Sequence, residues 1–353
     1  MNQAADLRLL VPGSLDQPTG GYRYDAQMVA GLRARGWSLA VDELEGDFPG
    51  PSGDAEHALE SALAAAPDGQ RVLVDGLAGG AFPEVLQRHA RRLRLIALVH
   101  HPLGEETGLD ARRRRELLAL EHAGLAAAEG IVTTSAFTSE VLAGWGVDAA
   151  RLRVVPPGVE RHAVASGPAP GAPPGLLAVG ALIPRKGQQH LLAALAGLTD
   201  RPWHLVLAGP ADRDPTFVQG LHRQVEEGSL QDRVSITGAC SDAYLAVLYD
   251  AASLFVLPSE YEGFGMVFTE AMARGLPMIT TTGGAIPYTV PAVAGKRVPP
   301  GDIRALREAL AHFLDDPQAR RAAGMAGREA TRRMPDWPAS VEAMERALRE
   351  LAP

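Results

Sequence analysis

Short apolar runs alternate with amphipathic stretches along the first half of the chain. The runs are near-continuous in Val, Leu and Ile, which is typical of strands buried on both faces of a parallel sheet. The pattern therefore predicts a doubly wound α/β domain. The expected strands are Leu7–Val11, Ser38–Asp42, Arg71–Asp75, Leu93–Val99, Gly130–Thr134 and Arg153–Val155. The expected helices are Tyr22–Arg35, Ala55–Ala65, Pro83–Arg92, Asp110–Ala128 and Ser139–Gly144.

The alternation stops at residues 162–175, HAVASGPAPGAPPG, whose Pro, Ala and Gly content predicts a linker or hinge. It then resumes and predicts a second parallel sheet. Here the expected strands are Leu176–Val179, His204–Leu207, Val234–Thr237, Leu254–Leu257 and Met278–Thr281. The expected helices are Gln188–Leu198, Phe217–Glu227, Ser241–Ala252, Val267–Arg274, Ile303–Leu314 and a last one near Pro338–Leu351 that could return to the first domain.

A length of 353 residues also favours two domains over one. We therefore expect an N-terminal domain over residues 1–161, a hinge over 162–175, a second domain over 176–334 and a C-terminal helix over 335–353. The predicted fold class is α/β, with two Rossmann-like doubly wound parallel-sheet domains facing each other across a cleft.

Composition narrows the functional classes. A net charge of −8 argues against nucleic-acid binding, which depends on Lys and Arg at phosphates. The single cysteine, Cys240, excludes an intramolecular disulfide and fits a reducing cytoplasm. Because the sequence shows no signal peptide and no apolar run long enough to span a bilayer, we expect a soluble cytoplasmic protein with at most peripheral membrane contact. The run Arg112–Arg115 is interpreted as a solvated helix face rather than a phospholipid or anionic-acceptor contact.

The densest chemistry lies in residues 253–277, SLFVLPSEYEGFGMVFTEAMARGLP. A buried strand leads into a glycine-containing loop, and a short helix begins just after Gly265. Free N–H groups at a helix start suit a diphosphate, and glycine lets the backbone approach it closely. Glu262 and Glu270 bracket this loop, and two such carboxylates suit a sugar nucleotide, with ribose on one side and sugar hydroxyls on the other.

Three further groups of residues follow predicted strands. Arg185 and Lys186 precede a helix start, where two cations either neutralise an anion held at the helix start or are simply solvated loop charges. His100 and His101 end the strand LIALV. Since neighbouring side chains on a strand point to opposite faces, only one of them should enter a site. Gly20 and Gly21 are expected in a loop between the first strand and the first helix.

The segment EGFGMVFTE resembles the Glu-x7-Glu signature of the family-4 retaining glycosyltransferases (glycosyl transferases group 1), which adopt the GT-B fold. FVLPS before it and EAMARGLP after it are similar to the family as well. The resemblance implies that Glu270 binds the ribose and that Glu262 binds hydroxyls of the donor sugar. It also implies that the diphosphate meets the backbone of the loop and helix start, at Phe264, Gly265, Met266 and Val267.

The resemblance assigns the other groups too. It implies that Lys186 neutralises the leaving diphosphate. Where the family often has arginine the chain has Ala181, so Arg185 is a candidate for part of this role. His100, with His101 as the fallback, is expected near the reacting sugar. The loop of Gly20 and Gly21 is expected to close over the donor phosphates and the acceptor, and Ala239 and Cys240 to lie near the nucleobase. A second departure is Tyr288, where the family usually has an acidic residue.

The predicted function is therefore a retaining glycosyltransferase that moves a sugar from a UDP- or GDP-linked donor to an unidentified small-molecule, glycan or lipid-linked acceptor. Its donor would be bound mostly by the second domain and its acceptor by the first. His100, Arg185, Lys186 and Glu262 are the expected catalytic residues. No cofactor and no metal are expected, because no His, Cys, Asp or Glu cluster has metal-ligand spacing in the sequence. The alternatives are a GT-B epimerase or phosphorylase, and a non-catalytic protein that binds sugar nucleotides.

Overall fold

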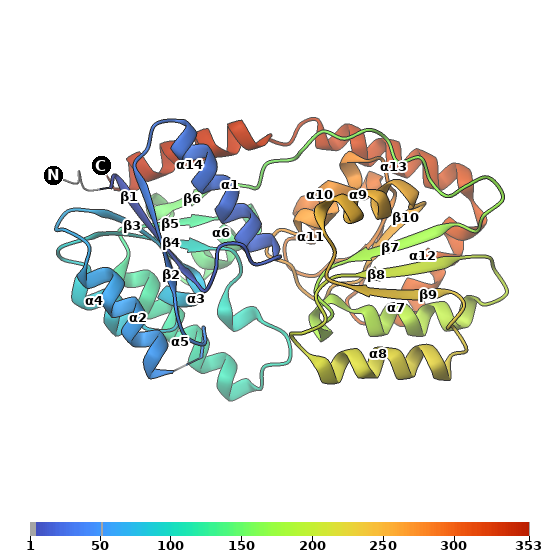
Figure 1. Cartoon of the computed structure of the whole chain (residues 1–353), viewed down its shortest axis with the longest axis horizontal. Helices are drawn as coiled ribbons and strands as arrows, with labels where there is room; N and C mark the ends of the chain where they lie inside the picture. The colour runs from blue at the N-terminus through green and yellow to red at the C-terminus, as the bar shows by residue number, and fades with distance from the viewer. Residues whose placement is uncertain (1–4, 51, 353) are drawn as a thin grey trace. The chain divides into compact units, whose positions relative to one another are not determined.

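The computed structural model describes residues 5–50 and 52–352, which form two compact units. Unit 1 contains the chain up to Gly158 together with the residues from Pro335 onward, and unit 2 is Val159–Met334 (Figure 1). Each unit is a parallel sheet of six strands with helices on both faces. The predicted fold class is confirmed for both sheets.

The sheet of unit 1 has the strand order β2-β1-β3-β4-β5-β6. Its strands are β1 Leu7–Pro12, β2 Leu39–Leu44, β3 Arg71–Asp75, β4 Arg94–Val99, β5 Gly130–Thr133 and β6 Leu152–Val154. Its helices are α1 Gly20–Ala34, α2 Gly53–Ala64, α3 Gly76–Gly79, α4 Pro83–His89, α5 Ala111–Ala127, α6 Ala136–Gly144 and α14 Trp337–Leu351, with short 3-10 turns at Leu103–Glu105 and Ala149–Arg151.

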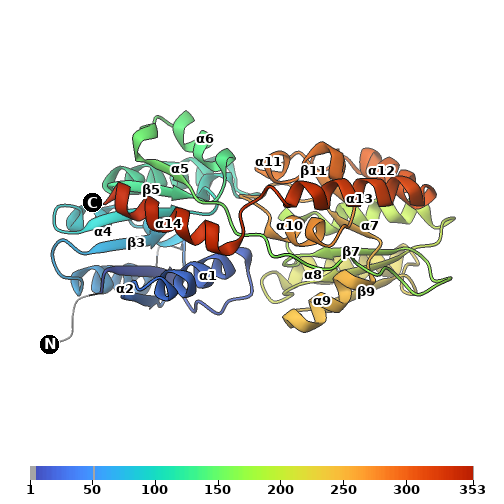
Figure 2. The same ribbon diagram turned by 90° about the horizontal axis from the view of Figure 1, so that it is seen from above.

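Helix α14 runs along unit 1 and lies beside α1 in both views (Figures 1 and 2). The approach is close, because a Cβ built on Gly31 of α1 would lie 2.3 Å from Val341 of α14. The guanidinium of Arg35 also donates to Glu345 of α14 at 2.5 Å. The last helix of the chain therefore completes the first unit.

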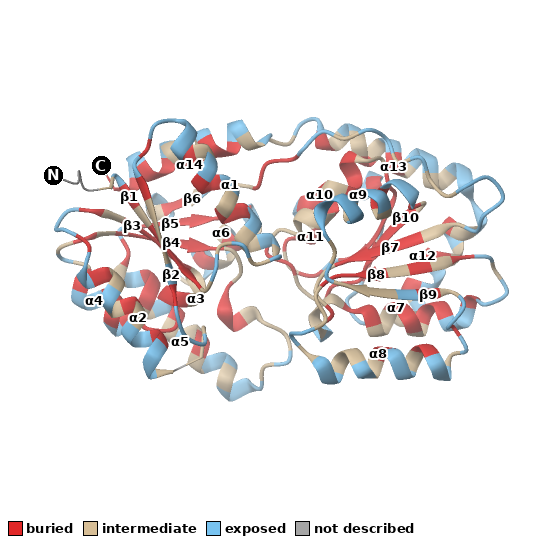
Figure 3. Ribbon diagram, viewed as in Figure 1, coloured by how far each residue is buried: buried red, intermediate tan, exposed pale blue. Residues whose placement is uncertain are grey.

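The sheet of unit 2 has the strand order β12-β11-β10-β7-β8-β9. Its strands are β7 Gly175–Val179, β8 His204–Ala208, β9 Val234–Gly238, β10 Leu254–Leu257, β11 Met278–Thr281 and β12 Gly295–Val298. Its helices are α7 Gln188–Leu195, α8 Pro215–Glu227, α9 Asp242–Ala251, α10 Met266–Ala273, α11 Ile286–Thr289, α12 Ile303–Asp315 and α13 Pro317–Thr331, with 3-10 turns at Pro184–Lys186, Ala196–Leu198 and Ala292–Ala294. The central strands of both sheets are buried (Figure 3).

Strand β12 and helix α13 are not among the elements expected from the sequence. Strand β12 reads GKRV, and only Val298 of it is buried, so it carries no apolar run. Helix α13 contains Gly324 and Gly327, which weaken a helical pattern. Packing explains one of these glycines, since a Cβ at Gly324 would lie 2.0 Å from the carbonyl oxygen of Gly275.

The Pro-, Ala- and Gly-rich residues 162–174 contain no helix or strand, Gly175 begins β7, and the whole segment belongs to unit 2. Backbone hydrogen bonds hold part of this segment. The N–H of Ala165 donates to the carbonyl of Arg274 at 2.8 Å, and the N–H of Gly167 donates to that of Asp250 at 2.8 Å. The segment is therefore attached to the surface of unit 2 at these points.

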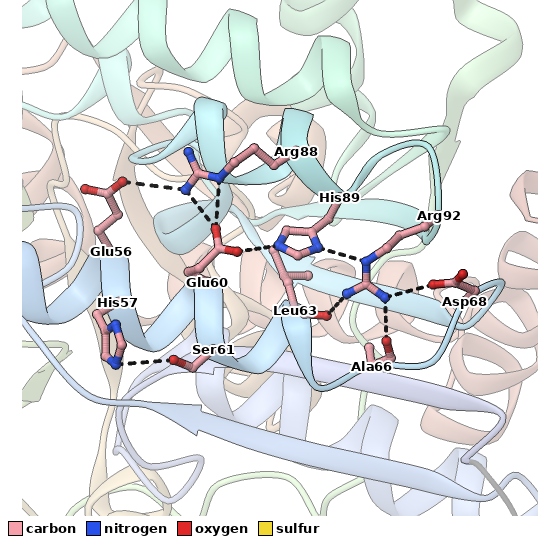
Figure 4. Close-up of polar contacts among 10 residues, drawn as sticks. All are labelled: Glu56, His57, Glu60, Ser61, Leu63, Ala66, Asp68, Arg88, His89 and Arg92. Carbon is pink, nitrogen blue, oxygen red and sulfur yellow. Dashed lines mark hydrogen bonds and ion pairs between the residues drawn. The ribbon is translucent and has the colours of Figure 1, made fainter.

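A charged network joins α2 to α4 and to the turn that follows α4 (Figure 4). Glu60 of α2 accepts from Arg88 at 2.7 Å and meets Nε2 of His89 at 2.7 Å. On the other side of the ring, Nε of Arg92 donates to Nδ1 of His89 at 3.1 Å. Because Nδ1 accepts a hydrogen bond, the proton of a neutral His89 must lie on Nε2, where it points to Glu60. Arg92 also donates to carbonyls at the end of α2, including that of Ala66 at 2.6 Å, and so caps the helix.

Candidate functional site

Each sheet has one position where the order of its strands reverses, and ligands of open α/β sheets bind at the carboxyl ends of the strands there. In unit 1 the reversal lies between β1 and β3, and in unit 2 it lies between β7 and β10. The residues expected to bind the donor diphosphate and sugar follow β7 and β10. Gly20 and Gly21 follow β1, and His100 follows β4, the neighbour of β3. The fold therefore places most of the candidate residues near these two switch points.

Glu262 lies in the loop after β10 and is only 5% exposed. One of its oxygens, Oε1, accepts from Nζ of Lys186 at 2.6 Å and from the hydroxyl of Ser259 at 2.6 Å. Its second oxygen lies 3.6 Å from the guanidinium of Arg185. Burial alone would raise the pKa of Glu262, but Lys186, Arg185 and these hydrogen bonds together lower it below its ordinary value. The structure thus brings together three residues that the sequence singled out, as a buried and ionised cluster.

Hydrogen bonds join the loop after β7 to the loop after β10 around this cluster. The N–H of Glu260 donates to the carbonyl of Arg185 at 2.8 Å, and Nη1 of Arg185 donates to the carbonyl of Tyr261 at 2.8 Å. Gly187 caps α7 with a φ of 73°, and a Cβ there would lie 2.2 Å from the carbonyl oxygen of Pro258. Only glycine combines this left-handed conformation with so close an approach.

Helix α10 begins after Gly265, which has a φ of 85° and gives the helix start no side-chain cap. A Cβ at Gly265 would lie 2.5 Å from the ring of Phe268, so the loop also needs glycine for space. Met266 and Val267 form the first turn and are half-buried. The carbonyl of Phe264 accepts from the hydroxyl of Thr289 at 2.7 Å. The loop thus has the helix start and the fixed backbone that an anion site requires.

Glu270 occupies a separate network on the same helix. Its Oε2 accepts from the hydroxyl of Tyr249 at 3.1 Å, and its backbone carbonyl accepts from Arg274 at 3.0 Å. The guanidinium of Arg274 lies 4.6 Å from the centre of the Tyr249 ring, a cation–π arrangement. Tyr249 therefore fixes the Glu270 carboxylate, and sequence reasoning missed it.

Ala239 and Cys240 follow β9, which is separated from β10 by two strands. At the usual strand spacing this places them roughly 14 Å along the sheet edge from the Glu262 loop. Ala239 is exposed, and Sγ of Cys240 lies 3.2 Å from the hydroxyl of Thr237. They are therefore at the same edge of the sheet but outside the Glu262 cluster.

Gly20 and Gly21 are not in a loop, as the sequence had suggested, because they are the first two residues of α1. Thr19 precedes them in extended conformation and provides no side-chain cap. Glycine is tolerated at this position because a helix start needs no side-chain contact with a preceding turn. The first turn of α1 lies next to His100, since a Cβ on Gly21 would be 3.6 Å from the imidazole ring.

His100 meets two buried carboxylates that the sequence analysis had overlooked. Its Nε2 lies 3.1 Å from Oδ1 of Asp25 and 3.6 Å from Oδ2 of Asp75. Asp25 is 1% exposed and Asp75 is 4% exposed. Asp75 ends strand β3, and a charged residue at the end of an apolar strand could have revealed it. Asp25 interrupts the buried face of α1, which is a second usable signal.

The two histidines at the end of β4 have different environments. The ring of His100 meets the edge of Tyr24 at a centroid distance of 5.3 Å. Burial alone would lower the pKa of His100, but the charge and hydrogen bond of Asp25, followed by the charge of Asp75, raise it to about 9. Burial is the largest influence on Asp75 and raises its pKa to about 7. His101 instead lies 3.6 Å from Glu106.

Potential metal-ligand atoms of Asp25, Asp75 and His100 lie within 4.8 Å of one another, and the described residues contain no other such group of three. These residues are far apart in the sequence, which is why ligand spacing did not reveal them. The distance of 3.1 Å between Nε2 of His100 and Asp25 is also that of an ordinary hydrogen bond, in which a proton occupies the nitrogen.

None of the described helices is long and apolar enough to cross a bilayer.

Two doubly wound parallel sheets, each with a switch point of its own, are the architecture of a GT-B protein. Residues 161–330 match the family Glycosyl transferases group 1, and residues 76–162 match Glycosyltransferase Family 4. Sucrose-phosphate synthase from Thermosynechococcus elongatus superposes with a TM-score of 0.82 and 26% identity over 98% of both chains. The chain therefore belongs to the group 1 glycosyltransferase family, as its Glu-x7-Glu segment had indicated.

Curated relatives agree with this assignment. The chain is 30% identical to the MMP alpha-(1->4)-mannosyltransferase of Mycolicibacterium hassiacum over 274 residues, which are 73% of the chain and 65% of that protein. It is 32% identical to the D-inositol 3-phosphate glycosyltransferase of Kineococcus radiotolerans over 243 residues, which are 60% of the chain and 55% of that protein. The matched part thus spans between about half and two thirds of these relatives.

Proposed function

We propose that the protein is a retaining glycosyltransferase that moves a sugar from a nucleoside-diphosphate sugar to an acceptor hydroxyl without a metal ion. The observation that carries the proposal is the buried cluster of Lys186, Arg185 and Glu262 beside the start of α10, at the switch point of unit 2. The family and the names of the relatives support glycosyl transfer.

The donor would be held by groups along the carboxyl edge of the second sheet. The amides at the start of α10 would receive the diphosphate, with Lys186 and Arg185 stabilising the negative charge that develops as it leaves. Glu270, fixed by Tyr249, would accept from the ribose hydroxyls. Glu262 would exchange part of its contact with Lys186 for hydroxyls of the donor sugar. Ala239 and Cys240 would lie near the base.

The test is incubation of the full chain with a panel of UDP- and GDP-linked sugars and a mixture of acceptors, in the presence of EDTA. We expect a new glycoside whose anomeric configuration, assigned by NMR, is that of the donor. An inverted product refutes retention, and activity that EDTA abolishes and a divalent cation restores refutes metal independence.

Three other outcomes would refute glycosyl transfer and identify a different function. Conversion of the donor without an acceptor would identify an epimerase, and cleavage that requires phosphate would identify a phosphorylase. Donor binding without turnover across the panel would identify a non-catalytic protein. Glu270→Ala should weaken donor binding in every one of these cases, whereas Glu262→Ala should mainly change the preference among sugars.

A further inference from the structure

Three ionisable side chains from three elements meet at the switch point of unit 1. Asp25 comes from the second turn of α1, Asp75 from the end of β3 and His100 from the residue after β4. The described residues offer no other position where two buried carboxylates share one imidazole nitrogen within 3.6 Å. Each buried carboxylate destabilises the fold by several kcal/mol unless its charge is compensated. Packing alone therefore does not explain why two of them lie here.

The geometry points to Asp25 and Asp75 as positioning residues that hold His100 as a doubly protonated imidazolium, so that His100 acts in the transfer reaction as a cationic hydrogen-bond donor and not as a general base. This inference rests on the proposed function for its catalytic part only. The charge state of the ring is a property of the protein without substrate.

The buried carboxylate of Asp25 requires a compensating charge. Asp25 is almost completely buried, and its Oδ2 has no hydrogen-bond partner among the described residues. Within the described part of the chain, its other oxygen, Oδ1, is hydrogen-bonded to His100 alone, at 3.1 Å. A neutral imidazole protonated on Nε2 would give this carboxylate one hydrogen bond but no opposite charge. An imidazolium gives it the hydrogen bond and a positive charge as well.

Neighbouring groups also restrict rotation of the His100 ring. The edge of Tyr24 packs on one part of His100, and the first turn of α1 at Gly21 lies against another. Asp75 is itself fixed, because its Oδ1 accepts from the N–H of Leu77 and caps α3 while Oδ2 faces the ring. With Nε2 thus directed to two carboxylates, Nδ1–H is the donor left for another group.

The two carboxylates near the ring, Asp25 and Asp75, both raise the pKa of His100. The ionisable groups packed against it are Asp25 and Tyr24 from α1 and Asp75 from the end of β3. The raised pKa of about 9 for His100 means that the ring keeps its proton through neutral pH. A base must be unprotonated before it can act, so an imidazolium of this kind stabilises negative charge or orients a substrate oxygen instead.

The direct test is a pH titration of the full chain with 13Cε1-labelled histidine, followed by NMR without substrate. Of the ten histidines, the signal of His100 is identified by its loss in His100→Gln. We expect its midpoint near pH 9 in the parent protein, and a midpoint lower by about one to two pH units in Asp25→Asn. Asp75→Asn should give a smaller decrease, and it provides a second variant if the first fails to fold.

A matched control exists in the same unit. The pair of Glu60 and His89 is also a carboxylate–imidazole contact, at 2.7 Å, but it lies on α2 and α4. Glu60→Gln should leave the midpoint of His100 unchanged. A parent midpoint at or below the ordinary 6.5, or no change in Asp25→Asn, would overturn the inference.

Two further measurements complete the test. In the first, Zn²⁺ or Mn²⁺ is added at pH 7.5 to chelator-treated protein. A metal needs the lone pair of Nε2, which an imidazolium does not have. A metal-induced shift of the His100 signal that is absent in Asp25→Asn would therefore overturn the inference. Where transfer is detected, kcat/KM should fall as pH rises through the His100 midpoint, and this limb should move to lower pH in Asp25→Asn. A rate that rises through the midpoint would identify a general base instead. Absence of transfer would refute the proposed function and leave the NMR result standing.

Discussion

Replacing Glu121 with Gln should make unit 1 more stable at alkaline pH and leave its stability at pH 5 nearly unchanged. Glu121 lies on α5 and is 2% exposed. Its Oε2 accepts from the N–H of Leu103 at 2.9 Å, whereas Oε1 has no partner among the described residues. Burial raises the pKa of Glu121 to about 8, although hydrogen bonds from the backbone of Leu103 and Gly104 act against the rise.

The direction in which the free energy of unfolding changes with pH follows from the number of protons bound in each state. Between the ordinary pKa of 4.5 and the folded value of about 8, the folded protein holds a proton on Glu121 that the unfolded chain has lost. The free energy of unfolding therefore falls as pH rises through this interval and levels off above it. At about 1.4 kcal/mol per pH unit, the full interval corresponds to roughly 5 kcal/mol. Gln stays neutral at every pH and keeps an oxygen that can accept from Leu103.

Urea unfolding of parent and variant at several pH values between 5 and 8.5 measures this effect. In a Trp203→Phe background the remaining tryptophans, Trp37, Trp145 and Trp337, all lie in unit 1 and report on it alone. The variant should gain about 2–5 kcal/mol over the parent between pH 5 and pH 8.5. Contributions from Asp75 and His100 are present in both proteins and cancel in the difference.

Glu116→Gln on the same helix is the matched control, because this carboxylate is exposed and paired with Arg112. It should show no comparable gain at alkaline pH. A difference between parent and Glu121→Gln that is the same at pH 5 and pH 8.5 would mean that Glu121 is ionised in the folded state at both, and would refute the reasoning.

Three other substitutions test the site and its frame by urea unfolding with Trp203 retained, so that unit 2 is followed as well as unit 1. Lys186→Met should destabilise unit 2 by about 3–5 kcal/mol, because it leaves the buried Glu262 carboxylate poorly compensated. Adding Glu262→Gln should recover part of that loss, and a double variant whose loss is the sum of the two single losses would contradict the pairing. Gly187→Ala should cost more than about 1 kcal/mol because of its positive φ and close backbone neighbour, whereas Gly220→Ala, a helix position with no atom near the new Cβ, should be neutral or stabilising. Arg92→Ala should destabilise unit 1 by about 1–2 kcal/mol through loss of its bonds to the end of α2, and an unchanged midpoint would show that water replaces them.

Hydrophobic pattern was sufficient to predict most of the fold. Strands such as Arg71–Asp75 and Leu254–Leu257 match the structure residue for residue, because continuous apolar runs bounded by polar residues have one stable location in a doubly wound sheet. Strand β12 was missed because an edge strand with one buried side chain has no such run. Helix α13 was missed because Gly324 and Gly327 weaken its helical pattern, and the close approach of Gly324 to the backbone of Gly275 is not recorded in local sequence.

The site shows the same division. The cluster of Lys186, Arg185 and Glu262 was accessible from sequence, since each residue lies within a few positions of a strand end or a helix start. Local sequence marked Asp25 and Asp75 as unusual but could not join them to His100, which lies 75 and 25 positions away from them. Their importance depends on strand order, which sequence pattern did not provide.

Both switch points carry a buried pairing of opposite charges, but with the roles of the partners reversed. In unit 2 two cations, Lys186 and Arg185, surround one carboxylate, Glu262, whose pKa they hold below its ordinary value. In unit 1 two carboxylates surround one imidazole, whose charge depends on those neighbours. A rise of pH from neutrality through about 9 should therefore remove the charge of His100 in the first site, while Glu262 in the second site stays ionised. For this reason donor affinity and turnover should have different pH profiles, with the alkaline loss appearing in turnover.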